Sequence, residues 1–366
     1  MTDALFTPFT VKSLTTANRI AMSPMTRGFC PDGVPGDDVV AYYRTRAEGG
    51  VGLIISEAVA VDRAAAKEVA GIPVLHTEAA REGWRKVLAA VHGAGGRIGA
   101  QLHHAGAIRD AQAMGAPDVP NDEPDTMSDE DIADTIKAFA DGARTASALG
   151  FDAVEIHGAN GNLIDQFLWE GRNHRDDRWG GDPVKRTQFA TEILRAVREA
   201  VGEDFPIGFR ISQFKQGAFD AKIAETPEIL GEILAPLVDA GADMFHASQR
   251  RFWEPVFDGS DLNLAGWVRK LSGKPTITVG SVGLNGPDVT DLLTGKGGNA
   301  GPAGLEDLRA RLQAGEFDLV AVGRALLTDP HWTAKVRDDR IHDLRGFDLS
   351  SLGSLVATDP ALQAAA

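Results

Sequence analysis

The chain has 366 residues, of which 43% are hydrophobic and 24% are charged, so it can bury a large core and is neither disordered nor fibrous. The 37 Lys and Arg residues against 52 Asp and Glu residues give a net charge of -15, which argues against non-specific binding to nucleic acid or to an anionic membrane. The single cysteine, Cys30, excludes an intramolecular disulfide and a cysteine-based metal site, and it fits a reducing compartment. No secretory signal and no apolar run of about 18 residues is visible, so we expect a cytoplasmic protein without a membrane span.

Eight short runs of near-continuous apolar sequence recur along the chain, each followed by a longer connecting segment. Such runs are typical of parallel strands that are buried on both faces. The expected strands are Arg19–Ser23, Val51–Val59, Arg97–His103, Phe151–His157, Pro206–Ser212, Ala242–Ala247, Pro275–Gly280 and Phe317–Gly323. The expected helices include Glu78–His92, Asp129–Leu149, Pro183–Val201, Pro227–Ala240, Leu305–Ala314 and Pro330–Val336. Thr77 and Ser128 are expected to cap the first two of these helices.

Eight strand–helix units in one chain predict a (β/α)8 TIM barrel, formed as a single domain over residues 1–366 with a C-terminal tail from about residue 344. The alternative is an open, doubly wound sheet, but the early strands lack the glycine-rich turn of a dinucleotide-binding fold. The longest irregular stretches, Ala105–Met127 and Gln249–Ser260, follow the third and sixth strands. We therefore expect both to be extended βα loops on the catalytic face.

Glycines follow the seventh and eighth strands, where barrel enzymes commonly bind phosphate. Gly280 and Ser281 end the seventh run, and Gly323 and Arg324 end the eighth. Glycine lets backbone N–H groups approach an anion, and an arginine adds a charge-assisted contact. These four residues predict a phosphate site, and the alternative is a pair of turn glycines beside a solvated arginine.

Three further polar residues stand at the ends of the fourth and fifth strands. Arg210 follows an apolar run, so we expect it either to face a developing anion on a ligand or to form a buried salt bridge with a neighbouring acid. His157 and Asn160 are three residues apart just after a strand, where both can converge on one oxygen atom and polarise a carbonyl. A structural histidine beside an asparagine turn is the alternative for this pair.

A metal site is not expected. The adjacent residues His103 and His104 would be its first candidates, but neighbouring strand residues point to opposite faces and cannot easily ligate one ion. The acidic residues are also scattered along the strand ends, whereas a metal-dependent barrel hydrolase needs them clustered.

Taken in order, these strand ends match one family. From about Leu5 to about Lys335, the chain resembles the Old Yellow Enzyme family of FMN-dependent oxidoreductases. The matching stretches are Asn18–Arg27, Gly52–Ala58, Gln101–Gly106, His157–Gly161, Asn173–Gly181 with Arg186, and Val322–Arg324. Their order and their fit to successive strand ends make the resemblance specific. Neither an iron–sulfur motif nor a second flavin domain is recognisable, so we expect a relative other than the larger multi-domain members.

The resemblance implies that the chain binds FMN non-covalently, uses NADH or NADPH as reductant and acts on a small molecule. The implied cofactor residues are Pro24, Met25, Thr26, Ala58, Gln101, Arg210, Gly280, Ser281, Gly323 and Arg324. His157 and Asn160 would bind the carbonyl oxygen of a conjugated alkene, while hydride moves from flavin N5 to the β-carbon and a proton is added at the α-carbon. Arg175, Asp177 and Arg186 would tie the loop after the fourth strand.

The chain departs from the family at the expected proton donor. Members that reduce enones commonly have a tyrosine two positions after the asparagine, where this chain has Asn162. Its only tyrosines, Tyr42 and Tyr43, lie in the first helical segment and are no natural replacement. We therefore expect Asn162 to line the substrate pocket without acting as an acid. Trp253, after the sixth strand, is expected either to form a wall of that pocket or simply to pack within its loop.

Three functions follow from these observations. The leading one is an FMN-dependent ene-reductase. The second is a flavin oxidoreductase of quinones, nitro compounds or a desaturation, none of which needs the tyrosine acid. The third is a phosphate-binding barrel lyase or isomerase without flavin. The natural substrate, the choice between NADH and NADPH and the oligomeric state are not determined by the sequence.

Overall fold

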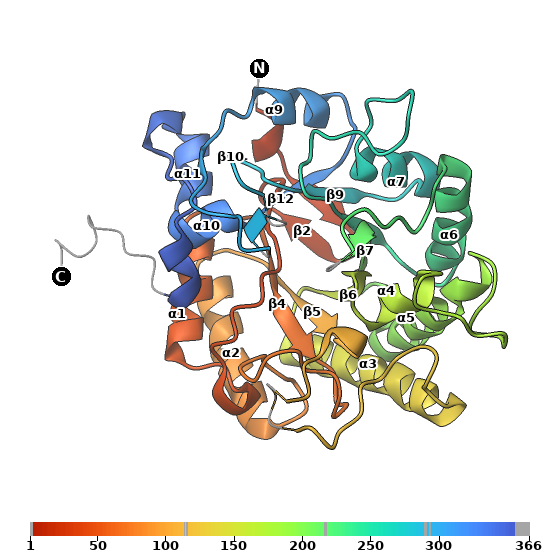
Figure 1. The fold of residues 1–366 in the computed structure, drawn as a ribbon. Coiled ribbons are helices and arrows are strands. Elements are labelled where there is room, and N and C mark those ends of the chain that lie inside the picture. The colour runs from red at the N-terminus through yellow and green to blue at the C-terminus, as the bar shows by residue number, and fades with distance from the viewer. Residues whose placement is uncertain are drawn as a thin grey trace.

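Eight parallel strands close into a barrel in the computed structural model, which describes residues 3–112, 114, 116–215, 218–288, 291–292 and 294–355. The strands follow one another around the barrel in chain order, and the last pairs with the first (Figure 1). They are β3 (Ile20–Met22), β4 (Leu53–Ala60), β5 (Ile98–His103), β6 (Ala153–Asn160), β7 (Ile207–Lys215), β8 (Met244–Ser248), β9 (Thr276–Val279) and β12 (Leu319–Val322). Each overlaps one of the eight apolar runs, so the predicted (β/α)8 barrel is confirmed as a single α/β domain.

Helices surround this barrel (Figure 1). They include α1 (Asp37–Glu48), α2 (Glu78–Gly93), α3 (Asp129–Leu149), α4 (Leu163–Leu168), α5 (Gln188–Val201), α6 (Pro227–Asp239), α7 (Leu264–Ser272), α9 (Glu306–Gln313), α10 (Arg324–Thr328) and α11 (Trp332–Arg337). Among the described helices, none is long and apolar enough to cross a membrane.

Capping side chains explain why α2 and α3 begin where the sequence predicts. The Thr77 hydroxyl accepts a hydrogen bond from the Ala80 N–H, and Ser128 forms a capping box with Asp131. Gly150 ends α3 in a left-handed conformation with φ 99°. The helix predicted from Pro183 is different, because a 3-10 turn comes first and α5 begins only at Gln188.

The barrel interior is filled from its amino-terminal end. Strands β1 (Phe9–Val11) and β2 (Leu14–Thr16) form an antiparallel hairpin whose apolar residues belong to the same buried cluster as inward residues of the barrel. That cluster includes Ala21, Leu53 and Ile277. A second, larger apolar core joins the strands to the surrounding helices. With the interior closed from below, the carboxyl ends of the strands are left for ligands.

The segment after residue 343, predicted as a tail, returns to the barrel over its described part. Phe347 pairs with Ala300 through two backbone hydrogen bonds. The Arg27 guanidinium donates to the carbonyls of Ser351 and Leu352 at 2.8 and 3.2 Å. Residues 344–355 therefore cover one side of the catalytic face. The remainder of the predicted tail, residues 356–366, lies outside the described residues.

Candidate active site

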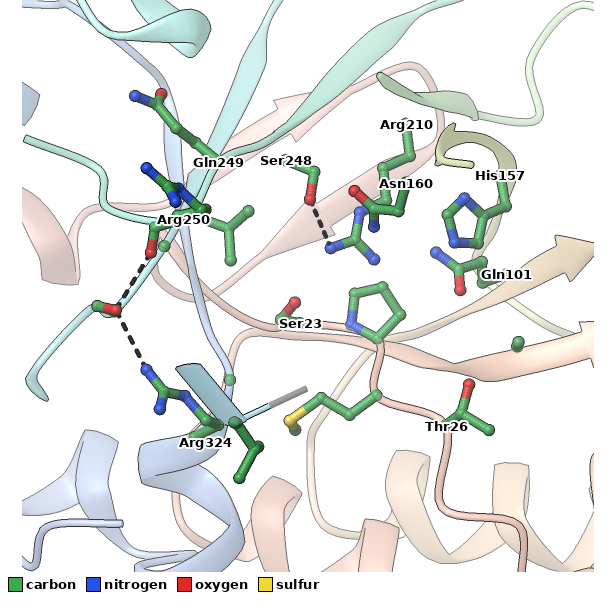
Figure 2. A pocket seen from close by; sticks show the side chains of 18 of the residues that line it. Ser23, Thr26, Gln101, His157, Asn160, Arg210, Ser248, Gln249, Arg250 and Arg324 are labelled. Carbon is green, nitrogen blue, oxygen red and sulfur yellow. Dashed lines mark hydrogen bonds between the residues drawn. The ribbon is translucent and has the colours of Figure 1, made fainter. Parts of the chain in front are cut away.

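The carboxyl ends of the strands surround a cavity of about 350 Å³ (Figure 2). This is the face on which barrel enzymes hold their active sites, because the βα loops follow these strand ends. Every predicted site residue except Trp253 lines the cavity. They are Pro24, Met25, Thr26, Ala58, Gln101, His157, Asn160, Asn162, Arg210, Gly280, Ser281, Gly323 and Arg324.

The turns after β9 and β12 form one end of the cavity. Arg324 donates hydrogen bonds to the Ser281 hydroxyl at 3.1 Å and to the Pro287 carbonyl at 2.8 Å. The Ser281 hydroxyl in turn donates to the Arg250 carbonyl at 3.1 Å, as the dashed lines in Figure 2 show. These contacts fix a cationic guanidinium in the cavity wall.

The two glycines of these turns are required for different reasons. Gly280 has φ 133°, and a Cβ atom there would lie 2.6 Å from the Gln249 carbonyl oxygen, so the protein itself excludes a side chain. Gly323 has φ -102°, and a Cβ there would make only ordinary contacts, 3.6 Å from the Met25 sulfur. Neighbouring protein atoms therefore do not demand glycine at 323. A ligand that fills the cavity beside Arg324 would demand it, which fits a phosphate group.

A buried polar network lies beside the cavity and orients Gln101. The Gln101 amide nitrogen donates to one oxygen of Glu155 at 2.7 Å, and His246 Nδ1 contacts the other oxygen at 2.8 Å. Although burial alone would raise it, the pKa of Glu155 is held below its ordinary value by His246, Arg210 and Gln101. The carboxylate therefore stays ionised. The side-chain carbonyl oxygen of Gln101 makes no hydrogen bond to the described residues. It is therefore left for a donor on a ligand.

Arg210 presents a charge to the cavity that no acid neutralises by contact. It is 7% exposed, and its hydrogen bond among the described residues is a long one of 3.3 Å to the Ser248 hydroxyl. Its Nε atom is buried without a partner, and no carboxylate in the described ranges pairs with it. Burial lowers the pKa of Arg210, and the nearby Glu155 opposes that shift. The salt-bridge alternative is therefore not found, and the guanidinium suits an anionic ligand.

His157 and Asn160 lie on the same side of the cavity (Figure 2). Burial, reinforced by the positive charge of Arg210, lowers the pKa of His157 well below its ordinary value, so the imidazole is neutral. Asn160 has φ 61°, and its backbone N–H donates to the Ser212 hydroxyl at 2.8 Å. Its side-chain amide makes no hydrogen bond to the described residues. The Asn160 side chain is therefore available to a ligand, whereas His157 lines the cavity with its ring nitrogens already in contact with the Ala159 N–H at 3.4 Å and the Asn162 amide at 3.2 Å.

Asn162 contacts His157, which the sequence did not predict. The Asn162 amide nitrogen lies 3.0 Å from the Ala159 carbonyl oxygen and 3.2 Å from His157 Nε2. Asn162 also stands immediately before α4, at its N-cap position. The side chain thus orients the histidine and offers no acidic proton of its own.

Several polar atoms along this cavity are buried without a hydrogen-bond partner in the described part of the chain. They are both ring nitrogens of His103, the side-chain oxygens of Asn160 and Asn162, and Nε of Arg210. Such atoms are rare in folded proteins because each costs free energy. A ligand with both donors and acceptors would satisfy them. With a cradle for phosphate at one end and these atoms at the other, the cavity fits a flavin mononucleotide.

The structure corrects the expectation that Trp253 forms a wall of the pocket. Trp253 is 38% exposed, and its ring packs edge-on against Phe252 at a centroid distance of 5.1 Å. Phe252 takes the buried position, which turns its neighbour toward solvent. The alternative of loop packing agrees with this arrangement. Tyr42 and Tyr43 lie in α1 and do not line the cavity, as expected.

Arg175, Asp177 and Arg186 tie the loop after β6, the fourth barrel strand, as predicted. Arg175 donates to the carboxylate of Asp177 and to the Met127 carbonyl at 2.7 Å, so it joins the loops after β5 and β6. Arg186 donates to the Leu168 carbonyl at 3.0 Å. His104 points away from the cavity and contacts Asp122 at 2.9 Å. Within the described ranges, no group of three or more His, Cys, Asp or Glu side chains could hold a metal ion.

Three charged residues in the cavity wall were missed as site residues. Arg27 follows β3, Glu68 follows β4 and Arg250 follows β8. All three lie in irregular segments, where side-chain direction has no period that could be read from the sequence.

Known proteins share this architecture. Residues 4–343 match the model of the NADH:flavin oxidoreductase / NADH oxidase family. The chain belongs to this family, the Old Yellow Enzyme family. Members of this family are flavin oxidoreductases, and the family implies FMN as cofactor and NAD(P)H as reductant. The Gly323 and Arg324 cradle and the unpartnered polar atoms agree with a flavin in this cavity.

Individual relatives support the assignment. An NADPH dehydrogenase of Geobacillus sp. (strain WCH70) is 34% identical over 343 residues, which are 91% of this chain and 93% of the relative. An NADH oxidase of Thermoanaerobacter brockii is 33% identical over 372 residues, covering 96% of this chain and 53% of the relative, so the chain spans about half the length of that protein. The structure of morphinone reductase in complex with tetrahydroNAD superposes with a TM-score of 0.78 at 27% identity, covering 95% of this chain and 93% of the other.

We expect Arg324→Ala to weaken FMN binding about ten- to hundredfold, since a charge-assisted hydrogen bond contributes about 1.5–3 kcal/mol. Titrating the apoenzyme with FMN and with riboflavin measures this. Riboflavin lacks the phosphate, so its affinity is expected to stay unchanged. Arg337→Ala, at the surface on α11, is the control. An equal loss for both ligands would remove Arg324 from the phosphate site.

Proposed function

We propose that the chain is an FMN-dependent reductase that uses NADH or NADPH to reduce alkenes conjugated to a carbonyl group. The observation that carries the proposal is the pair formed by His157 and Asn160. A neutral imidazole and an unengaged amide line one cavity, and Arg210 and Gln101 line it too. Such donors stabilise the negative charge that develops on a carbonyl oxygen as hydride adds to the conjugated carbon.

Each residue has a part in this proposal. When bound, FMN would supply the hydride transfer from NAD(P)H to the acceptor. Arg324 and Ser281 would hold its phosphate, while Gln101 and Arg210 would hold the polar edge of its ring. His157 and Asn160 orient the substrate carbonyl. Cys30 is buried and does not line the cavity, so the described cavity wall offers no thiol for a covalent linkage to the flavin.

Asn162 favours a second function, in which the flavin reduces quinones or nitro compounds. Its amide contacts His157 and cannot act as an acid near neutral pH. Acceptors whose reduced anion is already stable need no proton in the rate-limiting step. Quinones and nitro compounds are acceptors of this kind, and activated alkenes such as maleimides come close to them. A lyase or isomerase without flavin is separated from both by the visible absorbance spectrum of the purified protein.

Single-turnover oxidation of the reduced holoenzyme by four acceptor classes tests the proposal. We expect maleimides and quinones to react faster than simple cyclohexenones, because only the cyclohexenones depend strongly on proton delivery. General acid catalysis contributes about 10²–10⁴-fold to such a step. Nitro compounds complete the set, and each nicotinamide is compared as reductant. A holoenzyme that oxidises NAD(P)H with quinones but reduces no conjugated alkene would leave only the second function.

A further inference from the structure

An acid is needed at the cavity if simple enones are to be reduced, and the lining offers few groups. Among the described lining residues there is no tyrosine, lysine or cysteine, and Glu68 is the one carboxylic acid. The two histidines do not qualify. Burial lowers the pKa of His103 to about 3 and that of His157 well below its ordinary value, so neither imidazole carries a second proton to give.

The backbone on both sides of Glu68 is fixed to the barrel. Before it, the Ala66 carbonyl accepts a hydrogen bond from the Ala105 N–H at 2.9 Å. After it, the Gly71 carbonyl accepts one from the Cys30 N–H at 3.0 Å. A Cβ atom at Gly71 would lie only 1.9 Å from the Gly28 carbonyl oxygen, so the two segments are in close contact. The segment is thus held where its glutamate lines the cavity.

Glu68 lies toward the substrate-binding side. The Thr26 hydroxyl donates to Glu68 Oε1 at 3.4 Å. Figure 2 places Thr26 on the side of Gln101 and His157, with Arg324 at the opposite end. Through its contact with Thr26, the carboxyl group is therefore on the side of Gln101 and His157 and not at the Arg324 end.

The surroundings of Glu68 disfavour the charged form of its carboxyl group. No Lys, Arg or His in the described ranges pairs with it, unlike the acids at the surface of α2 and α3. Burial raises the pKa of Glu68, and the Thr26 hydrogen bond opposes this only in part. A raised pKa brings a carboxylic acid closer to the working pH of a general acid.

We propose that Glu68 is the acid that protonates the α-carbon of the substrate. It would replace the tyrosine that enone-reducing members of the family commonly have where this chain has Asn162. This proposal rests on the proposed reduction of conjugated alkenes. The hydride, with its two electrons, goes from reduced FMN to the β-carbon, and the carbon–carbon π bond breaks. The Glu68 O–H bond breaks as its proton goes to the α-carbon, and solvent then returns a proton to the carboxylate. The alkene is reduced and FMN is oxidised.

The test compares Glu68→Gln with wild type in single-turnover oxidation of the reduced holoenzyme. We expect the rate with cyclohexenone to fall about a hundredfold, within the usual range for a general acid, and the rate with a quinone to change little. Adding Asn162→Tyr to Glu68→Gln is expected to restore cyclohexenone reduction by supplying a phenol. Glu82→Gln, on the exposed face of α2, is the matched control. An unchanged cyclohexenone rate, or an equal loss with the quinone, would overturn the role of Glu68.

Infrared difference spectra of the holoenzymes give a readout that is independent of turnover. Wild type minus Glu68→Gln is expected to show the carbonyl stretch of a protonated carboxyl group near neutral pH. Its absence would overturn the proposal even if the rates agreed. Failure of the proposed function has a different signature, because wild type would then reduce no conjugated alkene at all. If wild type reduces enones and Glu68→Gln matches it, only the assignment of Glu68 fails.

Discussion

The double variant His157→Ala/Asn160→Ala is expected to reduce enones at least about a hundredfold more slowly than wild type. Loss of a single oxyanion donor costs about 10²–10³ in rate, and this change removes both groups that we propose to face the substrate oxygen. Phenol titration of the holoenzyme tests the same site without turnover. A phenolate bound beside the flavin is expected to give a long-wavelength charge-transfer band in wild type and none in the variant.

The single variants His157→Ala and Asn160→Ala are measured in the same way. Because the nicotinamide amide would use the same two donors, reduction of the flavin by NAD(P)H is expected to slow as well. Retained FMN and an unchanged melting temperature would show that the variant is folded. Phenol binding as tight as in wild type would exclude His157 and Asn160 from the site.

Lys215→Met is expected to destabilise the fold by about 3–5 kcal/mol, the usual cost of leaving a buried ion without its partner. Lys215 and Asp165 are 1% and 0% exposed, and their side chains meet at 2.7 Å. Burial raises the pKa of Asp165 and lowers that of Lys215, and the pairing opposes both shifts. Urea unfolding of the holoenzyme measures the loss.

The neutral pair Lys215→Met/Asp165→Asn is the matched control. We expect it to be more stable than Lys215→Met alone, because no uncompensated charge remains buried. The other Asp165 oxygen accepts the Gly161 N–H at 2.7 Å, an acceptor that asparagine retains. Since Gly161 follows Asn160, Lys215→Met is also expected to weaken phenol binding. Equal stability of single and double variants would show that the ion pair itself contributes little.

The sequence alone predicted the strands and about half of the residues that line the cavity. Apolar runs mark buried parallel strands, and a barrel places the residues that follow each strand on one face. Gly280, Ser281, Gly323 and Arg324 were predicted on this ground, and all line the cavity. Capping residues such as Thr77 and Ser128 likewise mark helix starts, because their hydrogen bonds are local in sequence.

The same reasoning did not predict which side chains of the long loops line the cavity. Trp253 was a candidate for the pocket because it follows the sixth strand, but its neighbour Phe252 takes the buried position. Glu68 was missed for the converse reason. Its direction depends on backbone hydrogen bonds from Ala105 and Cys30, which are distant in sequence.

What the sequence by itself determined is therefore the set of groups that end each strand, since strand order and side-chain alternation are local properties. What only the tertiary structure decided is which of those groups meet. The contacts of Gln101 with Glu155, of Glu155 with His246, and of Asp165 with Lys215 join residues 50 or more positions apart. Such pairs form only in the folded barrel, because folding brings strands and helices that are separate along the chain to within hydrogen-bond distance.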